Sequence, residues 1–251
     1  MKERIQINYD AISIRRLLGD DPSSPVDIFA LLGSQPDLTI VYYPMRDAIS
    51  GMSVKDDTLK LIAINSRLSK GRQRFTAAHE LCHLFFHNDF KTIVCSRDLV
   101  GARSDYEKEA DQFASFFLAP YEAMLHFINN ELNKKGERMS LDDIVRIEQH
   151  FGMSRQATLV RLQAEGLLSE EESNAMKTSV IRSAQRLGFS AELYQPSPES
   201  KQYLTVGSYI KMAHDLFASD IISRGKYEEL LLDAFRDDMV YGKDSVEDHY
   251  D

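Results

Sequence analysis

Two histidines and a glutamate stand in the pattern His-Glu-x-x-His at residues 79–83 of this 251-residue chain. Residues four apart lie on the same face of an α-helix, so His79 and His83 can both reach one cation. Imidazole nitrogens suit zinc, and a zinc ion with an open position lowers the pKa of its water to about 7. Glu80 stands next to the first histidine and can accept a proton from that water. The pattern therefore predicts a hydrolytic metal centre, with His79 and His83 as metal ligands and Glu80 as general base.

Two histidines are not a full ligand set, and the same helix offers two more donors. His87 follows His83 by four residues, but about 12 Å of helix rise separates it from His79. We therefore expect His87 behind a ligand, facing a substrate, or exposed at the helix end. Cys82 lies on the apolar face of the helix, which favours a small buried residue over a ligand.

A second predicted helix, over residues 106–118, carries three acids near its start. Glu107 and Asp111 share a face, whereas Glu109 lies about 200° around the helix from Glu107. With Glu107 as the third metal ligand, Asp111 can accept the free ring N–H of a ligating histidine. Glu109 is then expected to be solvated or paired with a cation. The alternative, in which all three acids form a solvated face, stays open.

The remaining elements indicate an α+β fold that is mainly helical. Apolar and β-branched runs predict strands over 38–43, 49–54 and 58–64, which we expect to form a small antiparallel sheet. Apolar spacing and capping residues predict the helices, and a polar segment at 170–204 is typical of a linker. The predicted helices, besides 106–118, cover residues 3–20, 26–32, 71–87, 121–133, 141–151, 154–165, 209–218 and 226–235.

Composition limits the class of protein. Apolar residues make up 43% and charged residues 27% of the chain, as in ordinary globular proteins. No apolar run approaches the roughly 18 residues of a membrane helix, and the first residues lack an apolar signal core. Two cysteines, Cys82 and Cys95, cannot form a disulfide framework. We therefore expect a cytoplasmic protein that does not bind membranes, and the net charge of −9 makes nucleic acid an unlikely partner.

Three segments resemble one known family. Residues 72–87 (RQRFTAAHELCHLFFH), 107–114 (EKEADQFA) and 117–120 (FLAP) are similar to the ImmA/IrrE family of zinc metallo-endopeptidases, although Cys82 stands where that family often has glycine. The resemblance covers residues 38–120. It implies a gluzincin-like site with one zinc ion per chain, held by His79, His83 and Glu107, with Glu80 as general base. It also implies a protein substrate, such as a phage or mobile-element transcriptional repressor. We further expect that an exposed edge strand, with residues 59–64 as the candidate, could hold an extended substrate by main-chain pairing.

A different function is suggested by residues 150–162, which have the pattern of a helix-turn-helix. Arg155 and Gln156 would then contact bases. However, residues 137–170 carry four arginines against six acids, whereas a DNA-binding motif should be basic. We therefore favour packing or partner docking for this motif, with a DNA- or repressor-binding regulator holding a structural or vestigial metal as the alternative. The expected organisation is a zincin-like domain (1–135), a helix-turn-helix-like segment (136–170) and a C-terminal region of linker and helices (171–251).

Overall fold

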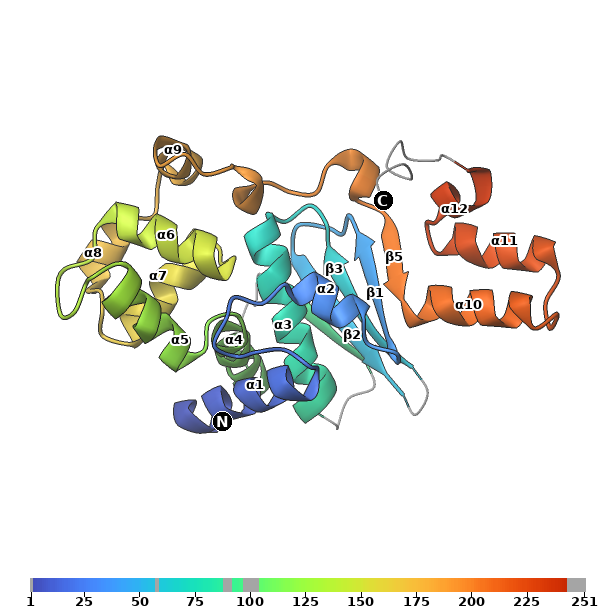
Figure 1. The fold of residues 1–251 in the computed structure, drawn as a ribbon, viewed down its shortest axis with the longest axis horizontal. Helices are drawn as coiled ribbons and strands as arrows, with labels where there is room; N and C mark the ends of the chain where they lie inside the picture. Colours follow the sequence, from blue (N-terminus) through green and yellow to red (C-terminus); the bar gives the residue numbers. More distant parts are fainter. Residues whose placement is uncertain (1, 57–58, 88–91, 97–103, 243–251) are drawn as a thin grey trace.

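A five-stranded sheet lies at the centre of the molecule (Figure 1). The computed structural model describes residues 2–56, 59–87, 92–96 and 104–242. The strands follow the spatial order β4-β2-β3-β1-β5. In chain order they are β1 (Leu38–Tyr43), β2 (Ile49–Lys55), β3 (Lys60–Asn65), β4 (Thr92–Ser96) and β5 (Leu204–Gly207).

The sheet is mixed, so the expectation of a wholly antiparallel sheet was wrong. β3 pairs antiparallel with β2 but parallel with β1, and β5 pairs antiparallel with the other side of β1. The prediction assumed that consecutive strands are neighbours, which holds only about two-thirds of the time. Here β3 lies between its two predecessors. The residues from Ile62 to Asn65 are all buried, which fits a central strand.

The first four helices pack together beside the sheet, and two of them, α2 and α3, contact its strands. The central helix is α3, which packs against β2 and β3 on one side and against α4 on the other, while α1 packs on α4 and α2 on β1. Their buried apolar side chains form one core with those of β1 and β3. The four helices are α1 (Arg4–Leu17), α2 (Ile28–Gly33), α3 (Lys70–Phe86) and α4 (Asp105–Leu118).

A group of short helices follows α4 at one end of the molecule (Figure 1). The predicted helix over 121–133 is α5 followed by a π-helical turn, Phe127–Glu131. The predicted linker 170–204 contains two short α-helices and two single turns of 3-10 helix. The first α-helix, α8, begins with a capping box between Ser169 and Glu172. These helices are α5 (Tyr121–His126), α6 (Leu141–Phe151), α7 (Arg155–Ala164), α8 (Glu170–Ala175) and α9 (Val180–Arg186).

After β5 the chain forms three helices at the opposite end of the sheet (Figure 1). They are α10 (Ser208–Ala218), α11 (Arg224–Asp233) and α12 (Asp237–Tyr241). The end of the chain, 243–251, lies outside the described residues. No helix in the described ranges combines the length and apolarity needed to span a membrane. The α+β class, the predominance of helix and the extra C-terminal helices are as predicted.

Candidate metal centre

The helix that carries the His-Glu-x-x-His pattern is fixed at its start by buried polar side chains. Asn65, at the end of β3, accepts hydrogen bonds from the backbone N–H groups of Met45 and Arg67. Gln73, in the first turn of α3, donates to the carbonyls of Ser66 and Leu68. These bonds satisfy buried groups where the strand turns into the helix, and so they set the direction in which α3 enters the core.

Close backbone contact brings β2 against the middle of α3. Gly51 lies so near this helix that an added Cβ would stand 2.5 Å from Cγ2 of Thr76 and 3.0 Å from Oε1 of Glu80. Only glycine permits this approach. The consequence is that Glu80 is fully buried between α3 and the sheet, while His79 and His83 face α4.

The predicted third donor reaches the histidines from the first turn of α4. Ser104 caps this helix by accepting a hydrogen bond from the backbone N–H of Glu107. A carboxylate is favourable here, because the positive end of the helix dipole lies at the N-terminus. Burial opposes ionisation of Glu107, but hydrogen bonds with His79 and His83 hold its pKa well below the ordinary value. The carboxylate is therefore ionised and available to a cation.

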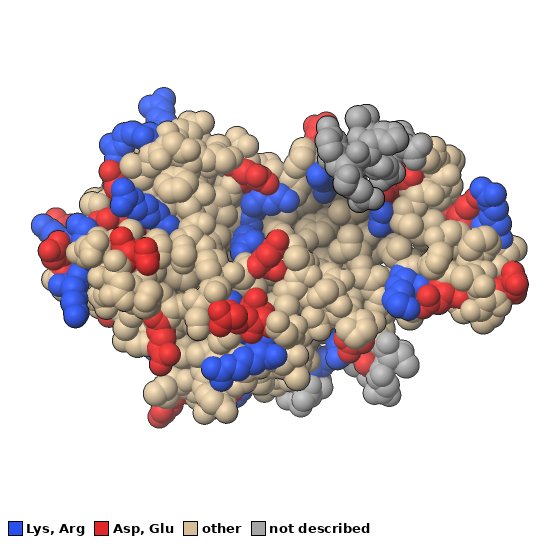
Figure 2. Space-filling model, viewed as in Figure 1, with Lys and Arg blue, Asp and Glu red and all other residues tan. Residues whose placement is uncertain are grey.

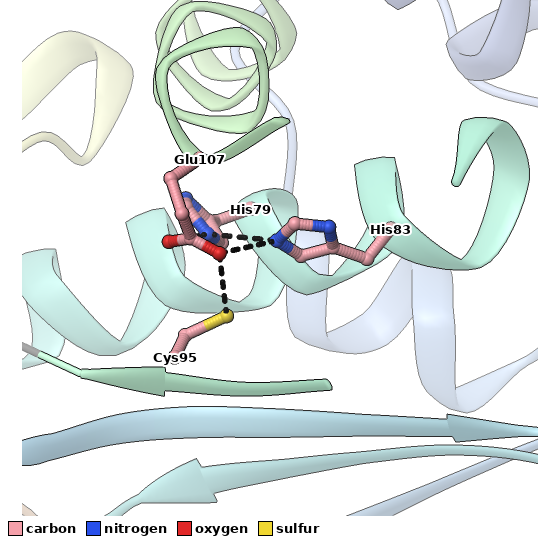
Figure 3. A group of neighbouring side chains, drawn as sticks. All are labelled: His79, His83, Cys95 and Glu107. Carbon is pink, nitrogen blue, oxygen red and sulfur yellow. Dashed lines mark hydrogen bonds and ion pairs between the residues drawn. The ribbon is translucent and has the colours of Figure 1, made fainter. Parts of the chain in front are cut away.

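The donor atoms of His79, His83 and Glu107 converge (Figure 3). The two Nε2 atoms lie 3.1 Å apart, and each lies 3.4 Å from an oxygen of Glu107. Zinc bonds of about 2.0–2.1 Å in a tetrahedron place neighbouring ligand atoms about 3.3 Å apart. The three separations match this edge length, so the donor set fits a zinc ion. That these residues bind metal stays a prediction.

The ring nitrogens that point away from this centre have their own partners. Nδ1 of His79 lies 3.0 Å from Oδ1 of Asp111, as the shared face of α4 predicted. Nδ1 of His83 lies 2.6 Å from Nδ1 of His87. Burial and the neighbouring His83 lower the pKa of His87 to about 4, so its neutral ring can accept a hydrogen bond from the Nδ1–H of His83. Both arrangements leave the Nε2 atoms free for a metal.

His87 thus takes the first of its three predicted positions, behind a histidine of the site, and is only 3% exposed. Glu109 is also buried and is paired with Lys2, whose backbone N–H donates to Oε2 and whose Nζ lies 3.4 Å from Oε1. This matches one of the two outcomes expected for Glu109. Cys82 is 1% exposed and belongs to the apolar core, as predicted.

The carboxylate of Glu80 has no hydrogen-bond partner for either oxygen within the described ranges. Burial raises its pKa, an effect that the neighbouring His79 partly offsets. A buried carboxylate without partners is costly, and such groups are uncommon unless they serve a function. Its position next to the converging donors suits a base that acts on a water molecule held there.

One residue of this site was missed by sequence analysis. Cys95, on β4, has its thiol 3.8 Å from Oε1 of Glu107, and it joins the three predicted donors in a group whose ligand atoms lie within 4.8 Å of one another (Figure 3). The sequence held a weak signal, since Thr92, Ile93 and Val94 are β-branched residues typical of a strand.

A cavity of about 410 Å³ opens beside these donors. Its walls are formed by α3, α4 and α7, and both His79 and Cys95 line it. From α7, the helix of the supposed DNA-binding motif, Gln156 and Val160 line the cavity. The motif therefore forms one wall of the candidate site.

Residues 34–163, more than half of the chain, match the family Peptidase_M78, described as the IrrE N-terminal-like domain. The chain belongs to this peptidase family. The M78 match extends from the end of α2 into α7, and so it includes the donors from α3, β4 and α4 and the cavity wall from α7. Comparison with curated proteins gives no match.

Membership of the M78 family agrees with the predicted ImmA/IrrE resemblance and supports a metallopeptidase type of activity, which acts on a protein substrate. The match ends at residue 163, beyond the domain boundary expected at 135. The division of the chain at 135 and 170 stays a prediction.

Proposed function

We propose that this protein is a zinc-dependent endopeptidase that hydrolyses a peptide bond in a protein substrate. The observation that carries the proposal is the buried carboxylate of Glu80, which lacks a partner beside the converging donors of His79, His83 and Glu107. Two histidines and a glutamate are a known ligand set of catalytic zinc.

A bound zinc ion would supply a Lewis acid that polarises the peptide carbonyl and lowers the pKa of a water molecule. Glu80 accepts the proton of the attacking water and returns it to the leaving amine. The raised pKa of Glu80, caused by burial, favours this transfer near neutral pH. His79 and His83 hold their rings in place through Asp111 and His87.

The cavity offers a place for a segment of the substrate. It combines apolar side chains, such as Phe75 and Phe116, with Arg72 at the start of α3. The earlier candidate for pairing with an extended substrate, residues 59–64, was wrong, because β3 is a central strand with neighbours on both sides. The edge strand on the side of the donors is β4, and main-chain pairing with substrate would take place there.

The substrate class follows from family resemblance, and we propose a transcriptional repressor of a phage or mobile element. The repressor encoded beside the gene is the first to test. Incubation of the two purified proteins should give two fragments whose new N-terminus is read by mass spectrometry. An intact repressor after prolonged incubation with zinc-loaded enzyme would exclude that substrate.

The alternative function is a DNA- or repressor-binding regulator with a structural metal. The position of Cys95 favours it, since four protein donors are typical of structural zinc sites. The helix-turn-helix weighs against the DNA-binding form, because Arg155 is 4% exposed and its guanidinium is paired with buried Glu148. Acidic and basic side chains are also interspersed on the face shown in Figure 2. Retention on duplex DNA at low salt would support the regulator.

The deciding variant is Glu80→Gln, which removes the base but keeps the shape of the side chain. We expect it to retain about one equivalent of zinc and to lose about 10²–10⁴-fold in cleavage rate. Glu122→Gln, on the exposed surface of α5, is the matched control and should cleave at the rate of the wild type. Undiminished cleavage by Glu80→Gln would remove Glu80 from the mechanism.

A further inference from the structure

Cys95 is aimed at the candidate metal site by a local irregularity of the sheet. The pairing of β2 with β4 shifts register between Ile49 and Gly51, which leaves Ser50 as an extra residue. The hydroxyl of Ser50 donates to the carbonyl of Cys95, and Gly51 is the pairing partner of Cys95. A β-bulge of this kind redirects the side chains next to it. The thiol is thereby directed toward Glu107 rather than into the apolar core.

The thiol stands where it would complete the donor set. Its sulfur and the donors of His79, His83 and Glu107 form a single group. Thiolates are strong zinc ligands, with bonds of about 2.3 Å, so a sulfur–oxygen separation somewhat larger than 3.3 Å is expected in a tetrahedron. The distance between Sγ of Cys95 and Oε1 of Glu107 is 3.8 Å, which is larger than 3.3 Å as this expectation requires.

A fourth protein ligand conflicts with catalysis, because a catalytic zinc needs an open position for water. We propose that Cys95 is a removable fourth ligand that keeps the metal centre latent, and that the centre becomes active when the thiolate leaves. This inference rests on the proposed peptidase function and concerns the regulation of the same site.

Two features make Cys95 a removable ligand rather than a permanent one. It lies on a strand of five residues at the edge of the sheet, where β4 pairs only with β2 among the described strands. Edge strands are held by half the main-chain bonds of central ones. Cys95 is only 2% exposed but lines the cavity, so a substrate segment or small reagent that fills the cavity would lie against this residue.

The buried carboxylate of Glu80, which lacks a hydrogen-bond partner within the described ranges, supports a latent catalytic site. Cys95 lines the cavity, whereas Glu80 does not and is fully buried. A structural metal site has no use for a buried carboxylate without partners. A latent catalytic site would use this carboxylate, because the water that Glu80 would bind can enter only after the thiolate of Cys95 has left.

The test begins with a readout that does not depend on activity. Cobalt(II) replaces zinc in such sites, and a cobalt–thiolate bond gives a charge-transfer band in the near ultraviolet. We expect this band in the wild-type protein loaded with one cobalt per chain. It should persist in Cys82→Ala, the matched control from the apolar core on α3, and vanish in Cys95→Ala. Wild-type protein that binds cobalt without the band would overturn the assignment of Cys95 as a ligand.

The second readout is cleavage of a mixed peptide library, with new N-termini identified by mass spectrometry. Cys95→Ala loaded with zinc should cleave at least about tenfold faster than the wild type. Cys95→Ser serves as a second variant, with circular dichroism to check that both are folded. Equal cleavage rates for the wild type and both variants would overturn latency.

The double variant Cys95→Ala with Glu80→Gln separates the two proposals. Loss of cleavage in the double variant supports both. Cleavage that survives in the double variant contradicts the peptidase mechanism, whatever the cobalt spectrum shows. Wild-type cleavage that depends on Glu80, together with a missing cobalt–thiolate band, contradicts the role of Cys95 alone.

Discussion

The Nδ1 atom of His79 lies 3.0 Å from Oδ1 of Asp111. This contact joins α3 to α4 and fixes the tautomer of His79, because the proton on Nδ1 is donated to the carboxylate and Nε2 keeps its lone pair. We therefore propose Asp111 as a positioning residue for the candidate metal site, and it stands one turn beyond Glu107 on the same helix.

Replacing Asp111 by Asn should weaken metal binding. An amide bonds the imidazole less strongly than a carboxylate, and such changes around metal-ligating histidines cost about 10–100-fold in affinity. Competition with a chromogenic chelator measures the zinc affinity. Asp215→Asn, an exposed change on α10, is the control and should bind zinc like the wild type. Equal affinities for the two variants would contradict a role for Asp111.

His87 should support the second histidine in the same way. Its neutral ring accepts a hydrogen bond from His83, with 2.6 Å between the two Nδ1 atoms. His87→Phe keeps an aromatic ring of similar size but removes the acceptor, and we expect about a tenfold loss of zinc affinity. His126→Phe, at the exposed end of α5, should have no effect. Partial recovery in His87→Gln would identify the lost acceptor as the cause.

The two glutamates of α4 should differ in their effect on metal content. Glu107→Ala removes a proposed ligand and should leave well under one zinc per chain after dialysis, measured by elemental mass spectrometry. Glu109→Ala should retain about one zinc, because Glu109 is paired with Lys2 and does not reach the donors. The reverse pattern would move the third ligand to Glu109.

The parts of this site that the sequence predicts are those that local helix geometry determines. Positions 79 and 83 share a helix face by spacing alone, and so do Glu107 and Asp111. If Glu107 reaches His79, then Asp111, one turn further along the same face, is near the other ring nitrogen of that histidine. These relationships need only the period of the α-helix and the chemistry of a ligating imidazole.

The parts that escaped prediction depend on contacts between distant segments. Cys95 reaches the site because β4 joins the edge of the sheet with a bulge at Ser50, and strand pairing partners are not encoded in local spacing. The same reason explains the parallel pairing of β1 with β3 and the addition of β5 from residues 204–207. The helix rise between His79 and His87 argued against His87 as a direct ligand of the same ion. Its contact with His83 depends on the conformations of the two side chains, which helix spacing does not determine.

A substitution in the cavity wall formed by α7 should lower the rate of catalysis without changing the metal content of the protein. Val160 is 53% exposed and lines the cavity. Val160→Asp places a charge beside the path of the substrate, and a pocket contact of this kind is worth about 10–200-fold in kcat/KM. Zinc content should stay at about one equivalent. Ile221→Asp, equally drastic but outside the cavity lining, should cleave normally, and a similar loss in both variants would contradict the assignment of this wall.

The start of α6, the helix that precedes this wall, should contribute to stability in a pH-dependent way. Asp143 and Ser140 form a capping box, in which Oδ2 of Asp143 accepts from the backbone N–H of Ser140 at 2.8 Å. Burial opposes ionisation of Asp143, but these hydrogen bonds and the charge of Lys134 lower its pKa below the ordinary value. The unfolded chain thus binds a proton at a higher pH than the folded protein does.

The stabilising effect of Asp143 is therefore complete above its unfolded pKa of about 3.9 and is lost as the pH falls through its lower folded value. Asp143→Ala should lower the free energy of unfolding by about 1 kcal/mol near pH 7, and this difference should shrink as the pH falls below about 3.9. Urea unfolding followed by circular dichroism measures it. The neighbouring Asp142, whose side chain is 42% exposed, provides the control variant Asp142→Ala, which should lose less. A difference for Asp143→Ala that grows on acidification would contradict the capping box as its source.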